Sequence, residues 1–195
     1  MSNPLDAGYG NNTVETLLKN ISPPIPDGAA VIKFGELCPF IDPAGVGILN
    51  QFAQQFSIPD ISDLSVNVFK DGVWTNPNQT LTPGEGVAFY NPSGTSLNAL
   101  FVGEVMQGTL VNLIAPGLSM KAGMVPQAGG LSTIHGLTLS SGDSVTTFSG
   151  QTAKTFTYDP TDGWNPSEPI LGVGEAFIVN SRNHQMWSRQ FQVNQ

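Results

Sequence analysis

The sequence predicts an all-β protein made of two tandem, similar halves, each a small β-barrel or sandwich with one short helix. The first observation is an internal repeat, in which three landmarks recur 90 positions apart: Trp74 and Trp164, Gly84 and Gly174, and Phe101 and Phe191. The second is composition, because only 11% of the 195 residues are charged while 22 Gly and 15 Pro supply turns. The third is the alternation of apolar and polar residues in short runs between those turns.

The second half, 106–195, shows the clearer pattern. Its predicted strands are Leu110–Ile114, Leu118–Val125, Asp143–Phe148, Ala153–Tyr158, Ala176–Val179 and Met186–Val193. Between the second and third of these, Leu131–His135 is predicted to form one helical turn that stops at Gly136. The run Ala176–Val179 is continuously apolar, which predicts a strand buried on both faces.

The first half, 1–105, carries an insertion at about 35–63. Gly28–Phe34 matches Gly142–Phe148 at a spacing of 114, whereas the spacing downstream is 90, so the difference of 24 residues lies before Trp74. Within the insertion Asp42 and Pro43 are typical of a helix start, and Pro59 of a helix end.

Apolar side chains recur at helical spacing in this insertion. They are Ile48, Leu49, Phe52 and Phe56. Such a stripe either packs onto its own domain or forms a docking helix for a partner, so Ile48, Phe52 and Phe56 are candidate interaction residues.

The first half also lacks its first strand. Leu5 aligns with Met124, so the counterpart of Leu110 would fall before Met1. Either the sequence is truncated, or the strand is filled from elsewhere in the chain, or another subunit supplies it by β-augmentation. An unfilled position leaves unpaired backbone groups that promote association, which makes Leu5 a further candidate interaction residue.

A better-formed helix is expected near the start of the first half. Asn12 is its predicted cap, with Glu15 three residues later. Val14, Leu17, Leu18 and Ile21 supply an apolar face, and Pro23-Pro24 ends the pattern.

Charge and cysteine content exclude several classes of function. The net charge of −8 and a pI near 4.4 argue against nucleic acid and against anionic membrane surfaces. No run approaches 18 apolar residues, so no membrane insertion is expected, and no signal peptide is recognised after Met1. The single cysteine, Cys38, is expected to be a buried small hydrophobe, with an intermolecular bridge as the alternative.

Motifs for chemistry are weak, and we expect no enzyme, no cofactor and no catalytic or metal-ligating residues. Glu85 and Glu175 occupy equivalent places and are expected to be turn residues whose carboxylates accept backbone N–H groups; an acid–base pair is the alternative. His135 is expected to be a structural histidine, and His184 a hairpin-loop residue.

Calcium and sugar are the two candidate ligands. Asp159, Asp162 and Glu168, with Asp71 in the first half, could make a calcium loop. They lack the alternating ligands of an EF-hand, and an Asx-type turn is favoured. Trp187 alternates with Ser188, so it is the candidate aromatic ring for stacking on a sugar at a surface.

A series of motifs runs along nearly the whole chain: Ala115-Pro116-Gly117, Gly142-Asp143-Ser144-Val145-Thr146-Thr147-Phe148, Thr157-Tyr158-Asp159 with Gly163-Trp164, Leu81-Thr82-Pro83-Gly84-Glu85-Gly86, and Leu100-Phe101-Val102-Gly103-Glu104-Val105. In these motifs the chain resembles modules of secreted bacterial proteins, notably from Verrucomicrobia and Planctomycetes. The resemblance implies secretion and a β fold, and it transfers no catalytic residue.

These observations predict a non-enzymatic structural or adhesive β-repeat protein of the cell exterior or cell surface. Its expected partners are copies of itself, assembled into a filament or surface layer by strand complementation. A carbohydrate-binding module that contacts a surface glycan is the alternative, and a glycan-active enzyme is a more distant one.

Overall fold

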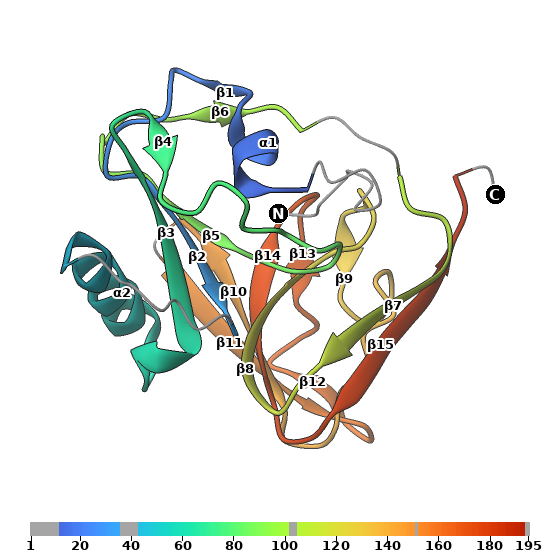
Figure 1. Cartoon of the computed structure of the whole chain (residues 1–195). Coiled ribbons are helices and arrows are strands. Elements are labelled where there is room, and N and C mark those ends of the chain that lie inside the picture. Colours follow the sequence, from blue (N-terminus) through green and yellow to red (C-terminus); the bar gives the residue numbers. More distant parts are fainter. Residues whose placement is uncertain (1–11, 36–42, 102–104, 151, 194–195) are drawn as a thin grey trace. The chain divides into compact units, whose positions relative to one another are not determined.

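The computed structural model describes residues 12–35, 43–101, 105–150 and 152–193 (Figure 1). The chain divides into two compact units. The C-terminal unit contains Pro83–Gly86 together with the described residues from Val105 onward. The N-terminal unit contains the other described residues, which lie before Pro83 and from Val87 to Phe101.

The structure confirms the β class. The described strands form five sheets, all of them open, so the barrel alternative is wrong for this part of the chain. Among the described residues there are two α-helices, and both belong to the N-terminal unit. The expectation of one short helix in each half is therefore also wrong.

The N-terminal unit has a four-stranded sheet and a small two-stranded one. Its elements are α1 (Val14–Leu18), β1 (Ile21–Ser22), β2 (Ala30–Phe34), α2 (Pro43–Phe56), the 3-10 turn η2 (Ile61–Asp63), β3 (Leu64–Lys70), β4 (Val73–Trp74), β5 (Ala88–Tyr90) and β6 (Asn98–Ala99). The larger sheet has the order β4-β3-β2-β5, with antiparallel neighbours, and β1 pairs with β6.

Helix α1 begins one residue later than predicted. Its cap is Thr13, whose hydroxyl accepts a hydrogen bond from the backbone N–H of Thr16 at 3.2 Å. The side chain of Asn12 instead donates to the carbonyl of Leu81 at 3.4 Å. The expected apolar face is confirmed at Val14, Leu17 and Leu18, which are buried. Ile21 is not part of this face, because the helix ends at Leu18.

Helix α2 lies in the predicted insertion. It begins at Pro43, where a missing N–H costs no helical hydrogen bond, and it ends at Phe56, before Pro59. Its buried residues include Leu49 and Phe52, and it packs against β3.

Gly47 in α2 is a site where stability can be raised. A Cβ added there would meet no atom within 4 Å, and glycine in an exposed helix interior is less favourable than alanine. We expect Gly47→Ala to raise the free energy of unfolding by about 0.5–1 kcal/mol in chemical denaturation. Gly35 is the matched control, because its Cβ would also meet nothing but its φ is +85°. Gly35→Ala should destabilise, and equal effects of the two changes would contradict this reasoning.

The C-terminal unit is made of strands and turns. Its elements are β7 (Gly108–Ile114), β8 (Gly117–Ala122), β9 (Gly129–Gly130), β10 (Ser144–Ser149), β11 (Thr152–Asp159), β12 (Gly163–Asn165), β13 (Ile170–Leu171), β14 (Ala176–Ser181) and β15 (Gln185–Phe191). The main sheet has the order β12-β11-β10-β14-β8. Strands β7 and β15 pair with each other, and β13 pairs with β9.

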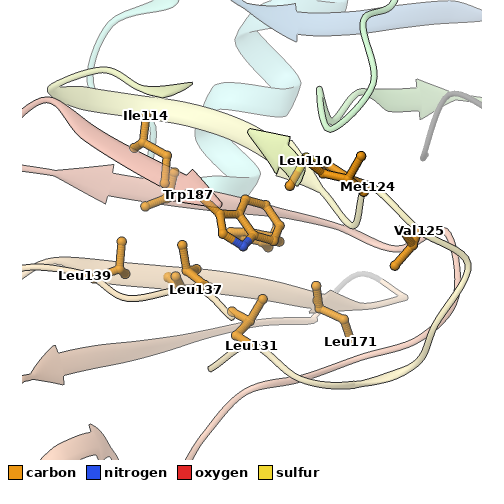
Figure 2. Close-up of a cluster of buried hydrophobic side chains, with 12 residues drawn as sticks. Leu110, Ile114, Met124, Val125, Leu131, Leu137, Leu139, Leu171 and Trp187 are labelled. Carbon is orange, nitrogen blue, oxygen red and sulfur yellow. The ribbon is translucent and has the colours of Figure 1, made fainter. Parts of the chain in front are cut away.

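The core of this unit collects side chains from separate sheets (Figure 2). The main sheet contributes Val145, Phe177 and Val179, and the β7–β15 pair contributes Ile114 and Trp187. Leucines of the segment between β8 and β10 complete the cluster. As predicted, β14 is buried on both faces, because its consecutive residues 177–179 are all buried.

The segment Leu131–His135 forms a single turn, as predicted, in which Ile134 donates its N–H to Gly130 at 3.0 Å and Gly136 donates to Ser132 at 3.1 Å. Its N-terminal end is held by Glu168, whose carboxylate accepts the backbone N–H groups of Ser132 at 2.6 Å and Thr133 at 2.7 Å. The turn closes at Gly136, whose φ of 68° ends any helical continuation.

Candidate functional site

The second Gly-Glu motif is a local turn, as predicted. The Glu175 carboxylate accepts the backbone N–H of Gly172 at 2.7 Å, and the backbone N–H of Glu175 donates to the carbonyl of Gly172 at 3.2 Å. Gly174 has a φ of 76°, in the region that favours glycine. Glu175 therefore stabilises the entry into β14.

The first Gly-Glu motif has a different environment, which the sequence did not reveal. Pro83–Gly86, which we call the strap, runs antiparallel to β8 within the C-terminal unit. Gly86 donates its N–H to Met120 and Ala122 donates its N–H to Gly84, both at 3.0 Å. The strap therefore lies along the edge of β8 that β14 leaves free.

Side chains of the C-terminal unit hold the strap in place. The amide of Asn112 donates to the carbonyl of Gly84 at 2.8 Å. The ammonium of Lys121 donates to the amide oxygen of Asn112 at 3.0 Å and to the carbonyl of Leu113 at 2.6 Å. Glu85 lies opposite Lys121 in the β-bridge. Burial lowers the pKa of Lys121, and the charge of Glu85 partly opposes that shift.

Both glycines of the strap are required by close approach. A Cβ on Gly84 would lie within 2.2 Å of the Asn112 amide nitrogen, and Gly84 also has a φ of +81°. A Cβ on Gly86 would lie 2.7 Å from the carbonyl oxygen of Lys121, which is backbone and cannot move aside cheaply. One signal in the sequence could have pointed here: the repeat has Ala176 where the first half has Gly86.

The tryptophans are structural. Trp74 packs edge-on to Phe69 with ring centroids 5.2 Å apart, and Trp164 packs likewise on Tyr158 at 5.0 Å. Trp187 is 1% exposed, and its indole N–H donates to the carbonyl of His135 at 2.7 Å. The expectation that Trp187 presents its ring at a surface is wrong, since the ring fills the core (Figure 2).

Of the other candidate interaction residues, three lie on α2. Leu5 and Cys38 lie outside the described residues. On α2, Phe52 is buried, whereas Ile48 and Phe56 are half-buried. The rings of Phe52 and Phe56 pack edge-on with centroids 4.7 Å apart. Most of this stripe is therefore covered, which fits packing onto its own unit.

The loop around Asp159 forms the expected Asx-type turn. Its carboxylate accepts the N–H groups of Thr161 and Asp162 and the hydroxyl of Ser141. Hydrogen bonds from Ser141 first, and then from the turn, lower the pKa of Asp159. Within the described part of the chain, no group of three or more His, Cys, Asp or Glu residues is placed to hold a metal ion. No described helix is long and apolar enough to cross a membrane.

His135 is a buried histidine without partners. It is 1% exposed, and neither ring nitrogen makes a hydrogen bond. One guanidinium nitrogen of Arg189 is likewise buried and unpartnered. Burial and the charge of Arg189 lower the pKa of His135, while Glu168 opposes them. The expectation of a structural histidine holds for its burial but not for satisfied hydrogen bonds.

This histidine predicts a pH-dependent stability. Because its pKa is lowered in the folded state, the unfolded chain takes up a proton near pH 6.5 while the folded chain does not. Stability should therefore fall as the pH drops from about 7.5 towards 5.5. We expect His135→Leu to remove this part of the pH dependence in thermal unfolding. The exposed His184, replaced by Leu, should leave it in place; loss of the slope in that variant would contradict the assignment.

Comparisons with protein-family models, with curated proteins and with solved structures found no match. The inferences about function therefore depend on the geometry of the two units.

Proposed function

We propose that this chain is a non-enzymatic structural or adhesive β-repeat protein of the cell exterior, and that its copies assemble by pairing strands. The observation that carries the proposal is the edge strand β5. Among the described residues β5 pairs with β2 alone, whereas its counterpart β14 in the C-terminal unit lies between two strands.

Matching registers support the view that the two sheets are copies of one unit. Ala30 pairs with Tyr90 in the N-terminal sheet, and Ser144 pairs with Asn180 in the C-terminal sheet. Ala30 and Ser144 lie 114 positions apart, and Tyr90 and Asn180 lie 90 positions apart. These are the two spacings of the sequence repeat.

Edge-on aromatic pairs and paired loops repeat as well. Phe69 pairs with Trp74, and Tyr158 pairs with Trp164, at the corresponding places of the two outer hairpins. Gly28 donates its N–H to the carbonyl of Phe69 at 2.8 Å. In the other sheet, Gly142 donates its N–H to the carbonyl of Tyr158 at 2.9 Å. Four elements that match in order and register favour duplication over coincidence.

Among the described residues, the two sheets differ at one strand position. The C-terminal sheet continues past β14 to β8, whereas no described strand lies beyond β5 in the N-terminal sheet. Val179, which corresponds to Phe89, pairs with Ser119 on β8. The strap just before β5 does pair with β8, but that pairing ends at Gly86. In the described part of the chain, β8 therefore pairs with the strap, and β5 pairs with β2 alone.

Hydrogen-bond alternation shows which groups of β5 are open. Phe69 donates its N–H to the carbonyl of Ala29 at 2.8 Å, so alternate residues from Ala29 bond to β3. The residues between them, Ala30 and Ile32, turn their backbone groups towards β5. Their partners on β5 are Tyr90 and Ala88, which lie on either side of Phe89. The N–H and C=O of Phe89 therefore point away from β2.

A second copy is the occupant that this edge fits best. Two β5 strands related by a two-fold axis run antiparallel, and a pair centred on Phe89 exchanges both of its outward hydrogen bonds. The shortness of the edge keeps the contact weak for a single pair, so association should depend on concentration.

The composition supports a role outside the cell. A low share of charged residues and many turns favour an extracellular β protein. The net charge of −8 argues against nucleic acid as a partner. The resemblance to modules of secreted bacterial proteins points the same way. The carbohydrate alternative loses its candidate ring because Trp187 is buried, and Glu175 is engaged in a turn rather than in an acid–base pair.

Two variants at one position test the proposal. Phe89→Ala removes the ring and keeps the backbone N–H, whereas Phe89→Pro removes both, and proline is tolerated where an edge N–H faces outward. Light scattering after size-exclusion chromatography should show larger species for the natural chain and for Phe89→Ala, and a monomer for Phe89→Pro. A natural chain that stays monomeric up to millimolar concentration would overturn the assembly part.

A further inference from the structure

We propose that the edge of β8 opposite β14 is a recognition site for an extended Gly-acidic-Gly strand, and that the strap of a second copy can occupy it by exchange. The site lies wholly within the C-terminal unit and uses only described residues. In the structure it is filled by the chain's own Pro83–Gly86.

Backbone hydrogen bonds give the site its general affinity for a strand. The carbonyl of Met120 accepts the N–H of the residue after the acidic one. The N–H of Ala122 donates to the carbonyl of the residue before it. These two bonds flank Glu85 and Lys121, which therefore form the closely spaced, non-hydrogen-bonded pair of an antiparallel ladder. This is the geometry of β-augmentation, in which the main chain binds and side chains select.

Three features select the peptide. At the first glycine, the Asn112 amide fills the space of a Cβ and donates to the carbonyl. At the second glycine, the backbone of Lys121 fills that space. Between them, the Lys121 ammonium faces the acidic residue and is itself held by Asn112 and Leu113. Side chains at either glycine position are excluded, and an acidic residue between them is favoured.

The repeat supplies an internal comparison. Its second copy reads Gly174-Glu175-Ala176, and the methyl group of Ala176 would meet the Lys121 carbonyl where Gly86 does not. The carboxylate of Glu175 is also already bound to the N–H of Gly172. Only the first copy of the motif therefore fits the edge of β8, which is why the proposed occupant is the strap.

Exchange with a second copy follows from how the strap is attached. It is four residues long, and the chain on both sides of it belongs to the N-terminal unit. Linkage within one chain favours the intrachain strap at low concentration, and mass action favours exchange at high concentration. Exchange would give each copy a contact besides β5, as a filament requires, but the recognition site does not depend on the pairing at β5.

A peptide-binding experiment tests the recognition site. Gly86→Ala should free the edge of β8, and the probe is a synthetic peptide with the sequence of residues 82–88, Thr-Pro-Gly-Glu-Gly-Val-Ala. Amide chemical shifts of β8 in the full chain should move on titration, with at least tenfold weaker binding to the natural chain. A control peptide with Ala at the second glycine should bind at least tenfold more weakly. Equal binding of the two peptides, or no binding to the variant, would overturn the recognition site.

A cysteine pair tests the exchange, and it also serves if Gly86→Ala does not fold. Glu85→Cys and Lys121→Cys, combined with Cys38→Ser, place two thiols opposite each other. Oxidation should give a disulfide-linked dimer whose share rises with protein concentration. Intrachain disulfides alone at every concentration would overturn exchange. Adding Phe89→Pro should leave the dimer in place, so failure of exchange and failure of pairing at β5 give different results.

Discussion

Replacing Trp187 by Ala is expected to lower the free energy of unfolding of the C-terminal unit by about 3–5 kcal/mol. The indole is 1% exposed and lies in the core cluster beside Phe177, with ring centroids 5.9 Å apart. Truncation leaves a cavity in this cluster and also leaves the carbonyl of His135 without its donor. Both losses lower the free energy of unfolding.

Chemical denaturation monitored by circular dichroism measures this effect. Met186→Ala is the matched control, because Met186 is the preceding residue of β15 and is 66% exposed. It should change stability by no more than about 0.5 kcal/mol. A Trp187→Ala variant as stable as Met186→Ala would contradict the placement of the ring in the core.

Asp143→Ala is expected to be the second most damaging change, at about 3 kcal/mol. The carboxylate is fully buried and accepts the backbone N–H groups of Ser140 at 3.0 Å and Arg182 at 2.9 Å. It also accepts from the side chains of Ser181 and Gln185. Removing it leaves the partly buried N–H groups of Ser140 and Arg182 without this acceptor, and it opens a polar gap among the side chains of Ser181 and Gln185.

Thermal and chemical unfolding of Asp143→Ala should be compared with Asp162→Ala. Asp162 is exposed in the nearby loop, so its truncation should have an effect below about 0.5 kcal/mol. Asp143→Asn keeps the shape and one acceptor, and should fall between the two. Equal stability of the Asn and Ala variants would argue that the carboxylate is not the centre of this network.

Local patterns in the sequence predicted most of the secondary structure. The apolar run of β14 and the Pro43 start of α2 are signals carried by neighbouring residues, and both elements are present in the structure. The turn at Leu131–His135 has the helical bonds Ile134 N–H to Gly130 and Gly136 N–H to Ser132, but its first N–H groups are bound by the distant Glu168, which no local pattern indicates. Thr13 rather than Asn12 caps α1, since both side chains suit a cap and only the tertiary contact of Asn12 decides between them.

The candidate sites were harder to predict for the same reason. Alternation along β15 separates Trp187 from Ser188 but does not say which face meets the core. The strap on β8 joins residues about 35 positions apart, and nothing local to Gly84 or Gly86 indicates Asn112 as a neighbour. The missing strand was inferred from spacing alone and stays a prediction: its counterpart Leu110–Ile114 pairs with β15, so the edge at β5 does not test it.

Amide hydrogen exchange at Phe89 tests the central claim, that copies of this chain pair through β5. The N–H of Phe89 points away from β2, so it should exchange quickly in dilute protein. At concentrations where larger species form, its exchange should slow by at least tenfold, while the neighbouring N–H groups that bond to β2 stay protected throughout. Exchange at Phe89 that remains fast while the mass of the species increases would contradict pairing at this edge.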